Sequence, residues 1–166
     1  FVSYADGFGV MALGDFNGDT KLDLVIQSGL CLGNGNGTFA SPISFPAGTL
    51  FALDVAIGDL NADTKPDLVF ANYGDGVVSV LLGNGNGTFA GPTMYSVPMN
   101  PMAVAIGTLD GMGGLDICVT SDTGPIAVFP GNGDGTLGEA TGYGSLNAPD
   151  VVIGDFDQDS RDDFAA

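Results

Sequence analysis

Two marker segments recur along this chain with a period of 44 to 50 residues, and this period constrains the fold more than any other feature. The first marker is an acidic loop of nine residues, found at 15–23, 59–67, 108–116 and 155–163. The second is a Gly-rich turn, which reads GNGNGTF at 33–39 and 83–89 and GNGDGTL at 131–137. A unit of this length holds four short strands, which is the size of one β-propeller blade.

Short apolar segments flank both markers. They run for three to six residues and are rich in Val, Ile and Leu, which favours strands over helices. In each repeat one strand precedes the acidic loop, a second follows it, a third runs into the Gly-rich turn and a fourth leaves it. We predict first strands at 10–13, 55–57, 104–106 and 151–153, second strands at 24–26, 68–70, 117–119 and 164–166, third strands at 30–32, 77–82 and 127–129, and fourth strands at 42–45 and 92–97.

The markers divide the chain into repeat units of about 5–48, 49–98, 99–147 and a partial 148–166. Residues 1–4 resemble a fourth strand without its blade. We therefore predict an all-β fold in which 1–166 is a single propeller or propeller fragment. It has about three complete four-stranded blades plus parts of a fourth. The 28 Gly and 9 Pro suit such a chain of tight turns.

The charge is strongly negative, with 20 acidic and 3 basic residues and a net charge of −17. Such a chain cannot replace phosphate counterions, so we expect no nucleic-acid partner and no adsorption to an anionic membrane. No apolar run approaches the roughly 18 residues of a membrane span, so we expect no membrane insertion. The chain has neither an initiator Met nor a signal peptide, and we interpret it as a mature product or an excised piece.

Histidine is absent, which removes the commonest general base and the commonest transition-metal ligand. Ser-His-Asp and Cys-His catalysis and the usual zinc sites are excluded for the same reason. Cys31 and Cys118 occupy apolar strand positions, which favours buried thiols. The carboxylates outside the acidic loops form no pair that stands out for glycoside hydrolysis. We therefore predict a protein that is not an enzyme.

The acidic loop has the composition of a cation site when its positions are numbered 1 to 9. Short side-chain oxygens at positions 1, 3, 5 and 9 of a tight loop, with the backbone carbonyl of position 7, would converge on one point. Six to eight oxygen ligands are what Ca²⁺ takes. The predicted ligands are Asp15, Asn17, Asp19, Lys21 and Asp23; Asp59, Asn61, Asp63, Lys65 and Asp67; and Asp155, Asp157, Asp159, Arg161 and Asp163, with Lys21, Lys65 and Arg161 contributing backbone carbonyls.

Two other interpretations of this loop were weighed. An EF-hand needs Gly at position 6 and Glu at position 12 between helices, and these loops have neither. A plain polar turn is the second, because Asp, Asn and Gly favour turns, but three loops in register make it the weaker interpretation. We expect the basic side chain at position 7 to point outward without competing for the metal. Three bound Ca²⁺ ions would bring the net charge from −17 to −11.

The third loop, 108–116, is degenerate. It has Thr108 at position 1 and Met112 at position 5, where the other loops have carboxylates. We predict that it keeps the fold and is empty of Ca²⁺.

The run of apolar strand, D-x-[ND]-x-D-x-x-x-D loop, second strand and GNGNGTF turn resembles the FG-GAP/VCBS repeat family, with weaker support from Phe8 and Gly9. That family includes the blades of integrin α-subunit propellers and many bacterial surface proteins. The resemblance implies Ca²⁺ loops between the first and second strands of each blade, on one rim of a propeller. It also implies a secreted or cell-surface setting.

From these observations we expect a non-enzymatic, Ca²⁺-stabilised extracellular module for adhesion, ligand recognition or scaffolding. The ligand is a protein or a glycan, bound by loops such as 72–76 and 121–125, which vary between repeats. One alternative is a self-assembling subunit, an oligomer or a filament, whose incomplete blades are completed by a neighbouring chain. Another is a carbohydrate-binding lectin. Asn36 and Asn86 are formal N-glycosylation acceptors, which the turn chemistry alone also explains.

Overall fold

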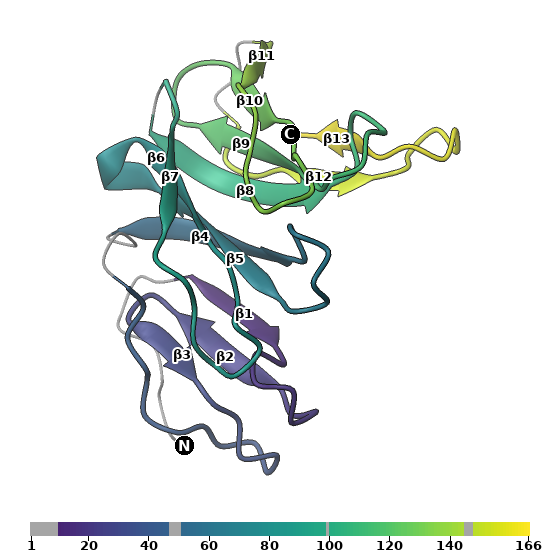
Figure 1. Cartoon of the computed structure of the whole chain (residues 1–166). Coiled ribbons are helices and arrows are strands. Elements are labelled where there is room, and N and C mark those ends of the chain that lie inside the picture. Colours follow the sequence, from purple (N-terminus) through teal and green to yellow (C-terminus); the bar gives the residue numbers. More distant parts are fainter. Residues whose placement is uncertain (1–9, 47–50, 99, 145–147) are drawn as a thin grey trace.

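The computed structural model describes residues 10–46, 51–98, 100–144 and 148–166, and these residues form a series of antiparallel sheets (Figure 1). The stray strand predicted at 1–4, and Phe8 and Gly9, lie outside the described residues. The first sheet holds β1 (Met11–Gly14), β2 (Asp23–Ile26) and β3 (Gly29–Cys31). The second holds β4 (Ala52–Gly58), β5 (Asp67–Asn72), β6 (Val77–Leu81) and β7 (Thr93–Ser96).

The third sheet holds β8 (Pro101–Gly107), β9 (Asp116–Ser121), β10 (Ile126–Phe129) and β11 (Thr141–Tyr143). The last pairs β12 (Val152–Gly154) with β13 (Asp163–Ala165). In every sheet the strands are paired in chain order, as in a meander. We call these sheets blades 1 to 4. Within the described part of the chain the one helix is the 3₁₀ turn η1 (Tyr73–Asp75), so no helix there could span a membrane.

The blades follow one another along an arc, with blade 1 at one end and blade 4 at the other (Figure 1). Contacts between neighbouring blades run through their first strands, so β1 lies beside β4, β4 beside β8, and β8 beside β12. The first strands are the innermost strands of a propeller, and this order is the one that a propeller requires. The structure is therefore all-β and propeller-like.

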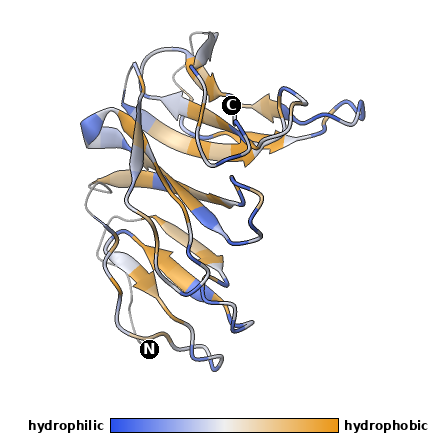
Figure 2. Ribbon diagram, in the orientation of Figure 1, coloured by the Kyte–Doolittle hydropathy of each residue, from blue (hydrophilic) through white to orange (hydrophobic). Residues whose placement is uncertain are grey.

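Three apolar layers hold the blades together, and each forms between the facing sides of two successive blades. Figure 2 shows that apolar residues gather in the strands and polar ones in the loops. Val25 and Leu30 of blade 1 pack against Leu68 and Phe70 of blade 2. Because both faces of a middle blade are covered, every residue of β5 and of β9 is buried. Such strands show continuous apolar runs instead of alternation.

Strand positions follow the predictions closely, although β4 and β8 each begin three residues earlier than predicted and two fourth strands differ. The strand predicted at 42–45 is reduced to a single bridge between Leu30 and Ile43, so blade 1 has three strands. A fourth strand in blade 3, β11, was not predicted, because Thr141–Tyr143 contains a Gly and is fully exposed. Cys31 and Cys118 are both buried, as predicted.

Candidate metal centre

The first acidic loop is closed by its own side chains. Asp15, at position 1, accepts hydrogen bonds from the backbone N–H groups of Gly18 (2.8 Å) and Asp19 (3.2 Å) through Oδ1. Its Oδ2 accepts from the N–H of Thr20 at 2.7 Å. Asn17, at position 3, accepts from the N–H of Asp19 at 3.0 Å through Oδ1. These bonds draw the backbone into a ring around the carboxylates, as short Asp and Asn side chains do in turns.

Loops 2 and 4 repeat the bonds that positions 5 and 6 donate in loop 1. Asp59 accepts from the N–H groups of positions 5 and 6 at 3.0 and 2.8 Å. Asp155 accepts from the same two positions at 3.1 and 3.0 Å. Position 6 has a positive φ in all three loops, +67° at Thr20, +66° at Thr64 and +70° at Ser160. Such angles are uncommon for residues other than Gly, so the surrounding bonds must hold them in place.

The donor set of these loops fits a hard cation. Carboxylate oxygens of Asp155, Asp157 and Asp159 all lie within 4.8 Å of one another on the exposed side of loop 4. Loops 1 and 2 place an Asn amide oxygen where loop 4 has Asp157. Oxygen ligands of this kind suit Ca²⁺ and leave nothing for a thiolate- or imidazole-seeking metal. A bound Ca²⁺ would be held by positions 1, 3 and 5 together with the predicted position 7 carbonyl and position 9 carboxylate.

We expected the lysine side chains at position 7 to point away from the predicted ligands, but they contact them. The Nζ atom of Lys21 lies 2.8 Å from Oδ2 of Asp19, and that of Lys65 lies 3.0 Å from Oδ2 of Asp63. The lysine hydrogen bond lowers the pKa of each of these carboxyl groups below its ordinary value. Both pairs are exposed to solvent, where an ion pair stabilises little. A cation at position 5 would therefore meet a carboxylate that is already ionised and only loosely paired.

The Asp at position 9 of loops 1 and 2 differs from the other acids, because it is buried and accepts hydrogen bonds from two separate segments, whereas Asp163 of loop 4 is half-buried and accepts from the N–H of Phe156 in its own loop at 3.1 Å. Asp67 accepts from the N–H of Leu60 in its own loop (2.8 Å) and from the N–H of Gly83 in the Gly-rich turn (2.8 Å). Asp23 makes the equivalent bonds in blade 1, at 2.9 and 2.8 Å. Burial is the largest influence on the Asp67 carboxyl and raises its pKa. Each oxygen keeps a second lone pair, which is what remains for a cation.

The Gly-rich turn lies against this carboxylate because it has no side chain at its first residue. A Cβ built on Gly83 would lie 2.2 Å from the carbonyl oxygen of Pro66, and one on Gly33 would lie 2.1 Å from that of Leu22. Only Gly allows this approach. The first Gly of the turn and the Asp at position 9 therefore form one joint, which ties the acidic loop to the third strand of the same blade.

The third loop keeps this joint although it lacks the carboxylates of positions 1 and 5. Asp116 is buried and accepts from the N–H groups of Leu109 (2.7 Å), Asp110 (2.9 Å) and Gly131 (2.9 Å). The position 9 bonds are thus formed in a loop that cannot build the full cation cage. This separates the structural role of position 9 from any role in binding a metal.

A carboxylate that the sequence did not single out fastens the third loop to its neighbour. Oδ2 of Asp162, at position 8 of loop 4, accepts from the N–H of Thr108 (2.8 Å) and from its Oγ1 (2.9 Å). These bonds, the backbone one first, lower the pKa of Asp162 below its ordinary value. Sequence reasoning missed this link, because position 8 is Leu22, Pro66 and Leu115 in the other loops and gives no repeat signal.

Similarity to known proteins agrees with the repeat organisation described above. The family model described as FG-GAP-like repeat matches residues 15–70 and 59–119. The chain belongs to the FG-GAP-like repeat family. No curated protein matches the chain. Among solved structures, one described as the structural basis of specific recognition of non-reducing terminal N-acetylglucosamine by an Agrocybe aegerita lectin superposes with a TM-score of 0.67 at 19% identity. The match covers 97% of this chain and 47% of that chain, so the FG-GAP chain spans about half the length of its neighbour.

The two loops that we predicted to bind a ligand are brought together in this FG-GAP structure. They join second to third strands and so lie on the rim opposite the acidic loops. Tyr73 Oη donates to Oδ2 of Asp122 across blades 2 and 3 at 3.0 Å, and Asn100 Nδ2 donates to the same oxygen at 3.1 Å. These bonds, with that of Asn100 the largest influence, lower the pKa of Asp122. The loops thus form one connected polar surface.

Proposed function

We propose that this chain is a Ca²⁺-stabilised, non-enzymatic binding module of a secreted or cell-surface protein. The observation that carries the proposal is the contrast among the four acidic loops. Loops 1, 2 and 4 share one ring of hydrogen bonds around short carboxylates. Loop 3 lacks the carboxylates of positions 1 and 5 and has a different set of hydrogen bonds. A motif that served only as a turn would not need carboxylates at these alternate positions.

A structural role for the ion follows from the charge. Each of loops 1 and 2 carries three Asp carboxylates within nine residues and loop 4 carries four at its predicted ligand positions, so the loops repel themselves without a cation. Extracellular modules bind Ca²⁺ with dissociation constants of about 10⁻⁴ to 10⁻³ M. In millimolar Ca²⁺ each occupied site would then add about 0.4 to 1.4 kcal/mol to the free energy of unfolding. Three sites together would matter for a domain of ordinary stability.

The test is the Ca²⁺ stoichiometry of the intact chain, measured by equilibrium dialysis. We expect three ions per chain. Asp63→Ala removes position 5 of loop 2 and should lower the count to two, whereas Met112→Ala changes the same position of loop 3 and should leave it at three. Asp63 is partly exposed and its change leaves the buried Asp67 joint in place. An unchanged count in Asp63→Ala would refute the cation cage.

The binding role is supported by the propeller-like fold and by the connected loop surface around Asp122. Recognition of a glycan is the second candidate function, and the structural likeness to an N-acetylglucosamine-binding lectin favours it. Titration of the chain with N-acetylglucosamine, followed by NMR, tests this function directly. Shifts confined to the loops around Tyr73 and Asp122 would support a lectin, and no shift at millimolar sugar would remove N-acetylglucosamine as the ligand.

Self-association is a further candidate, favoured by two apolar surfaces. Met11 and Leu13 of blade 1 are 65% and 53% exposed, although their equivalents in blade 2, Val55 and Ile57, pack against blade 1. At the other end of the arc Phe156 is 58% exposed, whereas its equivalent Phe16 is buried. A second blade against each face would bury these residues. Light scattering in millimolar Ca²⁺ tests this, because a mass that stays at 16.7 kDa at all concentrations excludes assembly.

A further inference from the structure

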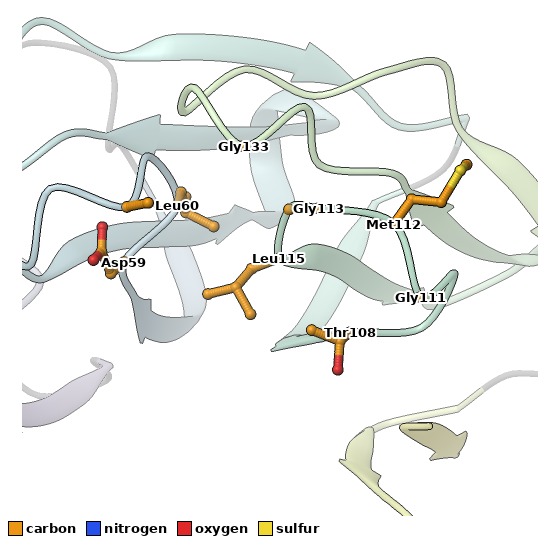
Figure 3. Close-up of a pocket in the computed structure, with 10 residues that line it drawn as sticks. Asp59, Leu60, Thr108, Gly111, Met112, Gly113, Leu115 and Gly133 are labelled. Atoms are coloured by element: carbon orange, nitrogen blue, oxygen red, sulfur yellow. The ribbon is translucent and has the colours of Figure 1, made fainter. Parts of the chain in front are cut away.

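A pocket of about 380 Å³ lies between acidic loops 2 and 3, where blades 2 and 3 meet (Figure 3). Asp59 and Leu60 form the loop 2 side. Thr108, Met112 and Leu115 form the loop 3 side, with Gly113 between the last two in the chain. The volume is within the range of small-ligand sites. The pocket therefore lies at the one acidic loop that has lost its position 1 and position 5 carboxylates.

Loop 3 lacks two side chains that loop 2 has at the equivalent positions. Thr64 and Lys65 of loop 2 correspond to Gly113 and Gly114 of loop 3. The stem of Lys65 covers the Gly-rich turn of its own blade, with Cδ 2.8 Å from a Cβ built on Gly85. In loop 3 the backbone itself lies on that turn, since a Cβ built on Gly114 would be 2.4 Å from a carbonyl oxygen. The loop 3 backbone therefore lies where the Lys65 stem lies in blade 2, on the Gly-rich turn of its own blade.

The chemistry of the lining favours an apolar group. Leu60, Leu115 and Met112 supply the side chains, and the oxygens of Asp59 already accept from the N–H groups of loop 2. The hydroxyl and N–H of Thr108 both donate to Asp162. A sugar, which has a hydroxyl on almost every carbon, would find the polar side chains here already hydrogen-bonded within the chain. Met112 is 70% exposed at the pocket, and a thioether side chain adapts well to different apolar partners.

The net charge of the chain selects the rest of the ligand, and it outweighs the one basic side chain near the lining, Arg161, whose Nε lies 4.0 Å from a Cβ built on Gly111. The chain carries −17, and three bound Ca²⁺ would still leave −11. A partner with the same sign would be repelled, whereas a cationic one is attracted and oriented. We propose that this pocket binds a basic peptide segment by one aliphatic side chain flanked by lysines or arginines. The proposal goes beyond the binding function proposed above, because it places a separate binding site, with its own partner class, at the rim of the acidic loops.

The structure offers a plug and a matched control for this proposal. A Cβ on Gly113 would meet nothing within 4 Å, and the same holds for Gly91, which is exposed and distant from the pocket lining. Gly113→Leu should therefore fill the pocket without straining the backbone, and Gly91→Leu adds the same side chain elsewhere. The Ca²⁺ stoichiometry of both variants, measured in the same preparations, should equal that of the parent chain.

The probe is the capped peptide Lys-Lys-Ser-Leu-Ser-Lys-Lys, titrated in millimolar Ca²⁺ and followed by the methyl NMR signals of Leu60, Met112 and Leu115. We expect saturable shifts at these methyls. An analogue with serine in place of leucine should bind at least about tenfold more weakly.

The Gly113→Leu variant should bind the two peptides equally, and Gly91→Leu should keep the preference for the leucine peptide. Equal binding of both peptides to the parent chain, no binding of the leucine peptide, or an unaffected Gly113→Leu variant would each overturn the proposal. If the chain binds three Ca²⁺ ions but not the peptide, the proposed Ca²⁺-stabilised module is retained and only the peptide site is rejected.

Discussion

The clearest test of how these blades are held together is Asp116→Asn, because it changes a buried joint in the loop that we expect to bind no metal. The carboxylate accepts three backbone N–H bonds. An amide keeps one oxygen and turns an N–H₂ donor toward at least one of those donors. One unsatisfied buried N–H costs about 1–3 kcal/mol, and two remaining bonds lose about 1 kcal/mol each when the acceptor becomes neutral. Relief from burying a charge offsets part of this loss, so we expect about 2–4 kcal/mol of destabilisation.

Urea unfolding followed by circular dichroism, in Ca²⁺ and in a chelator, measures this effect. Asp116→Asn should cost the same in both conditions. Asp67→Asn makes the same change in a loop expected to bind Ca²⁺, so its cost should be larger in Ca²⁺ than in chelator. A cost below about 0.5 kcal/mol for Asp116→Asn would refute the joint, since that is the range of ordinary surface changes. A Ca²⁺-dependent cost at Asp116 would refute the expectation that loop 3 is empty.

Three further predictions concern glycine, pH and thiol reactivity. Gly83→Ala places a Cβ 2.2 Å from a backbone carbonyl oxygen and should cost about 3 kcal/mol in urea unfolding, whereas Gly91→Ala meets nothing and should stay within about 0.5 kcal/mol. The bonds from Thr108 lower the pKa of Asp162, so their stabilising effect is present above the ordinary carboxyl pKa and is lost as pH falls through the lower folded value. Hydrogen exchange of β12 and β13 should therefore speed up over that acidic range, and Asp162→Asn should remove the change. Burial raises the pKa of Cys118 to about 12, so iodoacetamide at pH 8 should label it only after unfolding.

Most of the architecture could be predicted because the repeat reports the fold several times over. Each acidic loop must sit between a first and a second strand, so one correct placement fixes the others. The burial of residues 68–71 in β5 and 117–119 in β9 also follows from their unbroken apolar runs. Where the repeat is imperfect the prediction weakens. The bridge at Ile43 and the strand β11 both lie in fourth segments, which carry no marker and only weak apolar patterning.

The sequence predicts which residues make up the site, but not which of them are exposed to a cation and which are buried and hold the loop in place. Spacing identifies Asp59, Asp63 and Asp67 as three oxygens of one loop, yet it does not say which of them is buried. That depends on Gly83 approaching from a different part of the blade. Asp162 is a contact between repeats, and the pocket beside Met112 is lined by loop 3 at Gly113 and Gly114, where loop 2 has Thr64 and Lys65. Periodicity reports what recurs, and these features arise where one repeat differs from the rest.

These separate roles explain how blade 3 could lose the ligands of its cation site and keep its fold. The side-chain oxygens at positions 1, 3 and 5 lie toward solvent, where a cation reaches them directly, whereas the carboxylate at position 9 of loops 1 to 3 is buried and held by backbone N–H groups. Loop 3 has changed positions 1, 5, 6 and 7 and kept position 9 with its Gly-rich turn, so its inner joint is intact at Asp116. Its outer half is then free to change without loss of the fold, and Gly113 and Gly114 mark the place where it has. A surface that can vary while its support is fixed is the part of a repeat protein most open to a new ligand.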